Sequence, residues 1–267
     1  MTDRTLTRAL LALYTAFVFL FIFAPIIASF VFSFNSDRFP TIPLGSFTTH
    51  WYEKAFGGDA IWPAAQTSLL VSVCTAVLAT FIGFSAAYTD YRYDFFGKKA
   101  FLVLALLPPT IPLIIFALAT LGWLSMFNAS GMVISVIIAH TVLCSPFAMA
   151  VIRLRLNQMD PNLESAAWNL GASEWVTMKS VIIPFTKPSI IAALCLTAAV
   201  SFDEFAVAWF VSGLNKTVPV VILEILTGNV DPQINAIGSA VLVISITLVV
   251  IAQLFMMRLQ PKKQEAA

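Results

Sequence analysis

The chain has 267 residues, of which 59% are hydrophobic and only 11% charged, and its mean hydropathy is +0.89. This composition is too apolar for a water-facing globular surface, so it excludes an ordinary soluble protein and indicates a chain that lies in lipid. The net charge of +1 argues neither for nor against nucleic acid, and we expect no nucleic-acid partner. A bilayer core needs about 20 apolar residues per helix, so the length allows six spans but no large soluble domain.

Six apolar runs are long enough to cross a bilayer. The first follows Arg4 and Arg8 and is too long for the core of a cleaved signal peptide, so we predict that it is retained as a span. The predicted fold class is an all-α integral membrane protein, with one transmembrane domain over residues 1–267. Its predicted spans cover residues 9–34, 64–88, 100–121, 132–152, 189–211 and 234–257.

The third run contains the prolines Pro108, Pro109 and Pro112. Each proline removes a backbone donor and disfavours a straight helix, so this span is predicted to be kinked or broken. Two interpretations stay open. The span is either an ordinary kinked helix buried against its neighbours or a bend that lines a cavity in the membrane.

The positive residues predict the orientation, because Lys and Arg that flank spans are retained in the cytoplasm. With the N-terminus inside, twelve of the fifteen fall on the cytoplasmic side, so both termini are predicted to be cytoplasmic. The cytoplasmic residues are Arg4, Arg8, Arg92, Lys98, Lys99, Arg153, Arg155, Lys179, Lys187, Arg258, Lys262 and Lys263. The outer ones are Arg38, Lys54 and Lys216.

The longest cytoplasmic connection, residues 153–188 between the fourth and fifth spans, has the pattern of a folded segment. Asp160 can cap a helix that begins at Pro161, where a missing donor costs nothing. Gly171 can end this helix after Leu170 in a left-handed conformation. The pattern therefore predicts a short helix followed by a glycine bend.

A second helix is predicted to follow the bend. Ser173 can cap it, and it is predicted to begin at Glu174 and to end before Pro184. A helical pair of this kind suits insertion into a groove on a partner protein, although a surface helix that lies on the membrane is an equal alternative. The apolar residues on one face of the first helix are Leu163, Ala166, Ala167 and Leu170.

The connection resembles the "EAA" loop of bacterial ABC-importer permeases. The resemblance is carried by residues 165–173, Ser-Ala-Ala-Trp-Asn-Leu-Gly-Ala-Ser, and by residues 181–184, Val-Ile-Ile-Pro. Two positions depart from the family pattern. Ser165 occupies the place of the usual glutamate, with Glu164 one residue earlier, and Ile183 replaces the usual leucine.

The resemblance implies a transport subunit rather than an enzyme, located in the bacterial inner (cytoplasmic) membrane. In that family the loop docks in a cleft of a separate ATPase and transmits its closure to the membrane helices. The expected partners are an ABC ATPase dimer, a second homologous permease, a periplasmic or extracellular solute-binding protein and membrane lipid. ATP and magnesium belong to the ATPase, so no cofactor is expected on this chain. The implied ATPase-coupling residues are Glu164, Ser165, Ala166, Ala167, Trp168, Leu170 and Gly171, with Glu164 as an acidic partner for a basic residue of the ATPase.

The whole chain, including residues 201–205, is similar to permeases of spermidine/putrescine importers, so a polyamine is the expected substrate. Asp203 and Glu204 lie inside the fifth apolar run, where carboxylates usually face a bundle interior or a water-filled path. They could attract a cation, and Phe202 and Trp209 either line the same path or, as the more common role of aromatics in membrane helices, pack against neighbouring helices. The alternatives are carboxylates bonded to neighbouring helices, or a membrane boundary closer to the outside.

No motif for catalysis or nucleotide binding occurs in the sequence. It has no Gly-x-x-x-x-Gly-Lys-Ser/Thr, His-Glu-x-x-His or Gly-x-Ser-x-Gly pattern, and its three cysteines lie in apolar runs, so we expect no disulfide and no metal site. These absences argue against an intramembrane enzyme. The remaining alternative is an ion-coupled secondary transporter of a cationic substrate, with Asp203 and Glu204 as its coupling site.

Overall fold

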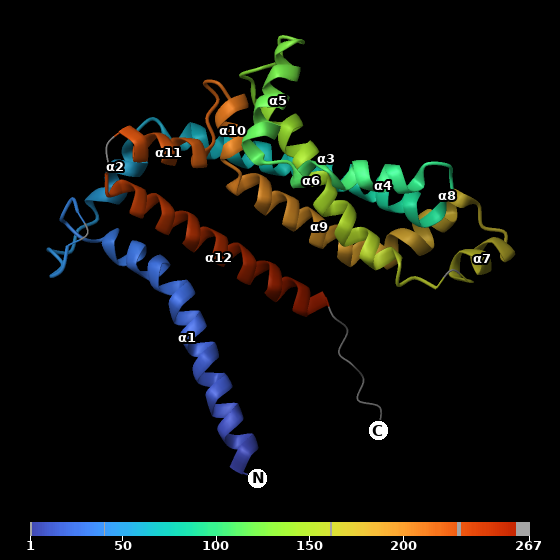
Figure 1. Ribbon diagram of the computed structural model, residues 1–267, viewed down its shortest axis with the longest axis horizontal. Coiled ribbons are helices and arrows are strands. Elements are labelled where there is room, and N and C mark those ends of the chain that lie inside the picture. The colour runs from blue at the N-terminus through green and yellow to red at the C-terminus, as the bar shows by residue number, and fades with distance from the viewer. Residues whose placement is uncertain (1, 40, 161, 229–230, 260–267) are drawn as a thin grey trace. The chain divides into compact units, whose positions relative to one another are not determined.

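The computed structural model describes residues 2–39, 41–160, 162–228 and 231–259, which fold almost entirely into helices (Figure 1). A single isolated β-bridge joins Asn35 and Phe47 in this part of the chain. Pro161, Lys262 and Lys263, which the sequence analysis uses, lie outside the described residues. The helices are α1 (Thr2–Phe32), α2 (His50–Gly57), α3 (Ile61–Arg92), α4 (Lys98–Leu106), the 3-10 turn η1 (Pro108–Thr110), α5 (Leu113–Ser125), α6 (Val133–Leu156), α7 (Asn162–Asn169), α8 (Glu174–Thr177), the π-helical turn η2 (Met178–Ile182), α9 (Ile183–Asp203), α10 (Ala206–Val211), α11 (Val218–Gly228) and α12 (Gln233–Leu259).

Four stretches of the described chain are long and apolar enough to cross a membrane, namely Thr5–Phe32, Ile61–Arg92, Val133–Leu156 and Glu174–Asp203. Three shorter apolar helical stretches cover Leu113–Ser125, Val218–Gly228 and Gln233–Ile244. The predicted all-helical membrane fold is thus confirmed for the described residues. The count of six spans stays a prediction.

The predicted break in the third run is confirmed. Helix α4 ends at Leu106, the two adjacent prolines lie in η1, and α5 begins only at Leu113. Between them, Ile111 and Pro112 have extended backbone, with ψ values of 134° and 126°. The interruption follows from the three prolines, which together withhold three donors from a continuous ladder.

The helix that begins at Glu174 continues further than predicted. The expectation that it ends before Pro184 is wrong, because α8, η2 and α9 follow one another without a break to Asp203. The π-helical turn immediately before Pro184 shifts the hydrogen-bond register, so the proline falls in the first turn of α9, where its missing N–H is tolerated. The hydroxyl of Thr186 donates to the carbonyl of Ile182 at 2.7 Å, and such side-chain bonds stabilise proline-containing helices.

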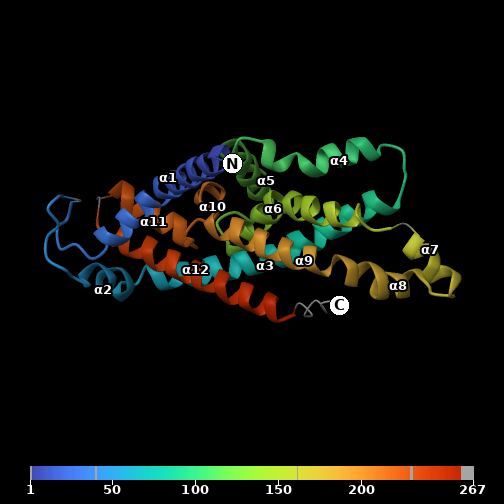
Figure 2. The same cartoon turned by 90° about the horizontal axis from the view of Figure 1, so that it is seen from below.

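The chain forms two compact units, one of residues 62–221 and one of residues 1–61 with 222–267. The first of these is built around α6, which packs along α9 (Figures 1 and 2). Near the first half of α6, apolar side chains of α5, α6 and α10 form one buried cluster that includes Leu124, Val136 and Val207. A second cluster near its other end includes Met149 and Ile152.

Helices α3 and α6 approach each other closely where both carry small residues. A Cβ atom placed on Gly83 would lie 2.6 Å from the Cβ atom of Ala148 and 2.6 Å from the backbone nitrogen of Met149. Small residues allow helix backbones to meet at such crossings in membranes. Glycine at position 83 is therefore required by packing.

The other unit contains α1, α2 and α12. Apolar side chains along α1, including Phe17 and Phe21, are exposed, as expected for contact with lipid. Lys54 of α2 forms an ion pair with Asp231, which precedes α12. Burial alone would raise the pKa of Asp231, but hydrogen bonds from Lys54 and from the backbone of Gln233 outweigh it and hold this pKa below its usual value of 3.8.

Candidate functional site

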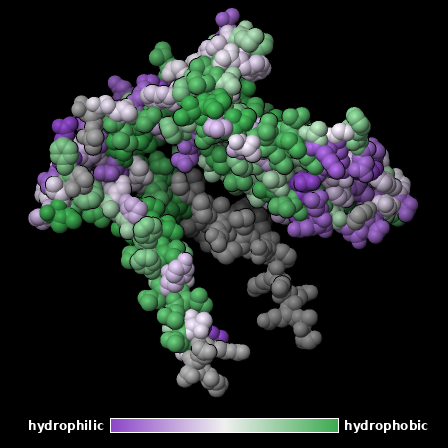
Figure 3. Space-filling view, viewed as in Figure 1, coloured by the Kyte–Doolittle hydropathy of each residue, from purple (hydrophilic) through white to green (hydrophobic). Residues whose placement is uncertain are grey.

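Hydrophilic residues gather at one end of the unit formed by residues 62–221. Figure 3 shows them over α7, α8 and the connection between α3 and α4, whereas the surface over α5 and α6 is largely hydrophobic. We call this region, residues 90–99 and 153–180, the polar end. Because apolar side chains face lipid and charged ones avoid it, the polar end lies outside the hydrocarbon core.

The predicted helix, glycine bend and second helix are present at the polar end. Helix α7 begins at Asn162, whose N–H donates to Oδ1 of Asp160 at 2.9 Å. Gly171 has a φ of +84°, which confirms the left-handed bend. The side chain of Ser173 accepts a hydrogen bond from the N–H of Val176 at 3.4 Å, which confirms the predicted cap.

One face of this helical pair is apolar and exposed. Leu170 is 89% exposed, and Leu163, Trp175 and Val176 are also exposed large apolar side chains. Ala166, Gly171 and Ser165 are exposed beside them. We call the set Leu163, Ser165, Ala166, Leu170 and Gly171 the docking face. Exposed apolar patches of this kind mark sites of interaction with a protein or with a membrane surface.

Glu164 and Trp168 do not belong to the docking face. Glu164 is 5% exposed, and its Oε2 lies 3.4 Å from Nε of Arg92 at the end of α3. The guanidinium of Arg92 also lies 4.7 Å from the ring centre of the half-buried Trp168. Of the predicted coupling residues, Glu164 and Trp168 therefore face Arg92 and not solvent. Ala167 is half-buried, between the side of α7 that faces Arg92 and the docking face.

The role of Arg92 beside α7 was not predicted from the sequence, in which Arg92 indicates only the orientation in the membrane. The signal that could have found it is the spacing of Glu164 and Trp168, which are four residues apart and so share one face of a helix. An acidic and an aromatic side chain on one face suit an arginine, which pairs with the first and stacks on the second.

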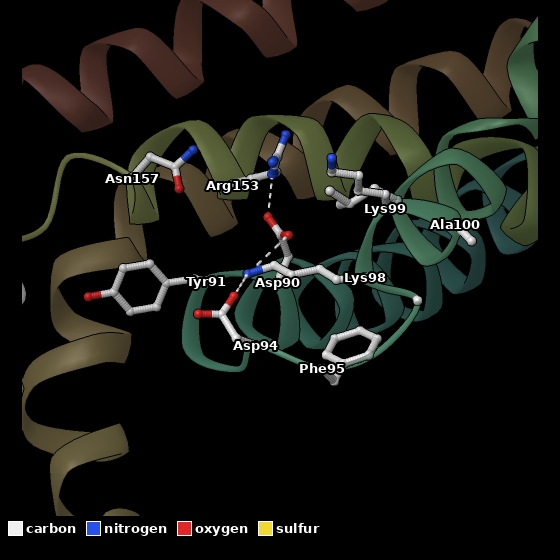
Figure 4. Close-up of a pocket in the computed structure, with 11 residues that line it drawn as sticks. Asp90, Tyr91, Asp94, Phe95, Lys98, Lys99, Ala100, Arg153 and Asn157 are labelled. Carbon is white, nitrogen blue, oxygen red and sulfur yellow. Dashed lines mark hydrogen bonds and ion pairs between the residues drawn. The ribbon is translucent and has the colours of Figure 1, made fainter.

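A second group of charges ties α3 to α4 and α6 at the polar end (Figure 4). The buried carboxylate of Asp90 accepts a hydrogen bond from Nε of Arg153 at 2.5 Å. Lys98 lies 3.8 Å from Asp90 and 2.9 Å from Asp94. These side chains line an open hollow of about 920 Å³. The four-residue spacing of Asp94 and Lys98 is a local sequence signal. The pairing of Asp90 with Arg153 could not be predicted in this way, because the two residues are 63 positions apart.

The predicted path residues lie at a break between two helices. Helix α9 ends at Asp203, Glu204 has extended backbone, and α10 begins at Ala206. Oε1 of Glu204 accepts a hydrogen bond from the N–H of Val207 at 2.8 Å, so this carboxylate caps α10. Asp203 is exposed and has no hydrogen-bond or ion-pair partner in the described part of the chain.

The two predicted aromatic residues flank this break. Phe202 is half-buried and Trp209 is exposed. Immediately before them, the hydroxyl of Ser201 lies 2.9 Å from Nδ1 of His140, and both residues are buried between α9 and α6. His140 therefore has a structural contact. In the described residues no group of three or more His, Cys, Asp or Glu side chains is placed to hold a metal ion.

Comparisons with known proteins agree on one family. Residues 79–265 match the profile of the family described as "Binding-protein-dependent transport system inner membrane component". The spermidine/putrescine transport system permease protein PotC of Haemophilus influenzae is 33% identical over 238 residues, which are 89% of this chain and 92% of that protein. The putrescine transport system permease protein PotI of Escherichia coli K12 is 30% identical over 84% of this chain and 82% of that protein.

Solved structures share the fold. A chain of a bacterial ABC transporter involved in the import of the acidic polysaccharide alginate matches with a TM-score of 0.71 and 17% identity, over 97% of this chain and 98% of that chain. At this identity the likeness concerns the fold alone. It extends over nearly the whole length of both chains.

Proposed function

The chain belongs to the family of binding-protein-dependent transport system inner membrane components, and from this premise we propose that it forms half of the translocation path for a polyamine. It is a multi-pass permease subunit of an ABC importer, not an enzyme. The observation that supports the substrate class is the similarity, over most of the chain, to permeases named for spermidine and putrescine transport. An ion-coupled secondary carrier is a different class of transporter, and family membership removes that alternative.

We propose that the docking face binds the ATPase. The proposal is supported by apolar side chains, above all Leu170, that are exposed on a pair of short helices outside the membrane. A helical pair laid into a groove would bury them. Ser165 contributes a hydroxyl where the family pattern has a carboxylate, so docking here depends on shape and apolar contact more than on charge.

The proposed partners are an ATPase dimer, a second homologous permease and a solute-binding protein. A solved structural neighbour of this chain is described in complex with an alginate pentasaccharide-bound periplasmic protein, which supports this kind of assembly in general. ATP and magnesium would be held by the ATPase. This chain contributes the membrane path and the docking face.

We propose that the polar end and both termini face the cytoplasm and that six spans cross the membrane over residues 9–34, 64–88, 100–121, 132–152, 189–211 and 234–257. Basic side chains at the polar end, among them Arg92, Lys98 and Arg153, support the orientation, since such residues are retained inside. The connection that carries α7 and α8 would then meet the ATPase from the membrane side.

We propose that Asp203 contacts the cationic substrate along the path. An exposed carboxylate at a helix break inside an apolar segment is suited to lower the barrier for an ammonium group, provided that the contact is weak enough for release. Phe202 and Trp209 flank the helix break, and aromatic rings at such places can attract ammonium groups. Glu204 has a smaller part in this proposal because it already caps α10.

The experiment that tests the proposal is co-purification of the tagged chain from membranes, combined with uptake of radiolabelled spermidine and putrescine. Gly171→Asp adds a charge to the docking face and is expected to abolish uptake while the protein stays in the membrane. Gly97→Asp is the matched control, since Gly97 has a φ of +86° and equally open surroundings, and it lies between α3 and α4, outside the docking face. Equal uptake by the two variants, or recovery of the wild-type chain without an ATPase, would contradict the proposal.

A further inference from the structure

Helix α7 is joined to the rest of the polar end by short non-helical segments. Residues 157–160 lead into it from α6, and residues 170–173 lead out of it to α8. A residue in the left-handed conformation and a short turn do not by themselves fix the direction of a two-turn helix. Contacts with α8 and η2 keep α7 within the loop, so a contact with another membrane helix is needed to fix its direction relative to that helix.

Arg92 supplies such contacts from a different membrane helix. It is the last residue of α3, whose 32 residues at about 1.5 Å per residue are long enough to cross the bilayer as one rod. Its guanidinium meets two residues of α7 at once, Glu164 at 3.4 Å and Trp168 at 4.7 Å from the ring centre. These residues are four positions apart and lie on one face, so together they define the orientation of α7.

The contact is costly to break because Glu164 is buried. Its carboxylate has an exposed fraction of only 6%, and a buried carboxylate without a partner carries a large desolvation penalty. The flat guanidinium both pairs with the carboxylate and stacks on the indole ring, which an ammonium group does less well. The geometry thus favours one arrangement of α7 on α3.

We infer that Arg92 is a positioning residue that couples α7 to α3, so that a displacement of the docking face reaches α3 directly as well as α6 and α9 through the chain. The inference rests on the proposed docking of this face to an ATPase. It also accounts for the position of the acidic residue in this loop. Glu164 lies one residue before the usual glutamate, which turns it by about 100° around the helix, toward α3 and away from the partner.

The test uses the full complex reconstituted in liposomes, with Arg92→Ala, the charge-swapped pair Arg92→Glu with Glu164→Arg, and Lys179→Ala. Lys179 is the matched control, since its ammonium lies 4.8 Å from the ring centre of Trp175 but stays within the α8–η2 segment and joins no second membrane helix. Three quantities are measured for each variant: the amount of ATPase that co-purifies, the rate of ATP hydrolysis, and the uptake of radiolabelled spermidine.

Coupling between two sites is typically worth about 5- to 150-fold, so we expect Arg92→Ala to reduce spermidine uptake roughly tenfold. Bound ATPase and ATP hydrolysis are expected to stay unchanged, since the side chains of the docking face are not altered and α7 keeps its contacts with α8 and η2. The swapped pair is expected to recover most of the uptake, and Lys179→Ala to behave as wild type. Unchanged uptake in Arg92→Ala would overturn the inference, as would loss of the ATPase together with uptake. A wild-type chain that recovers no ATPase would instead overturn the proposed function on which the inference rests.

Discussion

Leu170→Ala is expected to weaken binding of the ATPase without destabilising this chain. Leu170 is 89% exposed, so almost none of its apolar surface contributes to folding of the isolated subunit. Surface changes of this kind usually alter the free energy of unfolding by less than about 0.5 kcal/mol. Any large effect must therefore come from a partner that covers the side chain.

The expected loss follows from the area that docking would bury. Full burial of a leucine side chain is worth about 1.5–3 kcal/mol. Because Leu170 is exposed in the isolated subunit, a partner that covers it would gain most of this free energy on binding. Since about 1.4 kcal/mol corresponds to a tenfold change in affinity, the dissociation constant for the ATPase is expected to rise roughly 10- to 100-fold. When the ATPase concentration is limiting, this weaker binding would also lower the rate of uptake.

The assay is titration of purified ATPase onto the permease in nanodiscs, with Leu118→Ala as the matched control. Leu118 is a half-exposed leucine of α5, outside the docking face. Its replacement is expected to leave the affinity unchanged. Equal affinities of Leu170→Ala and wild type would refute the docking face, and equal losses in both variants would indicate a general disturbance of the membrane domain.

Three further changes test other parts of the structure. Gly83→Ala is expected to destabilise the chain by about 1–3 kcal/mol because the added Cβ would lie 2.6 Å from α6, while Gly122→Ala, with nothing within 4 Å, is expected to be neutral or stabilising; thermal melts in detergent compare them. Asp231 has a pKa below 3.8 in the folded chain, so its pair with Lys54 stabilises above that pH and is lost as the pH falls below it. Asp231→Asn is expected to remove this acid-dependent part of the melting temperature, worth less than about 1 kcal/mol because Lys54 is 44% exposed. Asp203→Asn is expected to reduce spermidine uptake by up to about fivefold, the equivalent of about 1 kcal/mol for an exposed ion pair, with ATPase affinity unchanged; equal loss of both would point to misfolding.

Local features of the chain were predictable from the sequence because they depend on residues close together. The break of the third run follows from three prolines within five positions, and the bend after α7 follows from Gly171. The cap at Ser173 is equally local. Each of these predictions required only backbone chemistry, and each is confirmed by the structure.

The side on which a residue faces was harder to predict because it depends on a distant partner. The prediction for Glu164 named a basic partner on the ATPase, and within this chain Glu164 lies against a basic residue that the loop sequence does not indicate, Arg92. The helix continues through Pro184 because a π-helical turn before it shifts the hydrogen-bond register and places the proline in the first turn of α9. No simple periodicity of the sequence indicates such a turn. In both cases, two conformations have a similar local free energy, and contacts with distant parts of the chain determine which of them forms.

The charge pairs at the polar end, Arg92 with Glu164 and Arg153 with Asp90, each join a buried carboxylate to a partly exposed arginine of a different element. Buried pairs of this kind often contribute little net stability, because desolvation offsets the attraction, but removal of one partner leaves a costly unpaired charge. Their effect here is therefore on geometry: each pair permits one relative placement of its helices and penalises others. A subunit that transmits a movement from the docking face to membrane helices requires rigid contacts between these elements more than it requires a higher free energy of unfolding. Replacement of Arg92 and Glu164 together by methionine and leucine is therefore expected to leave the melting temperature nearly unchanged while the uptake of spermidine is lost.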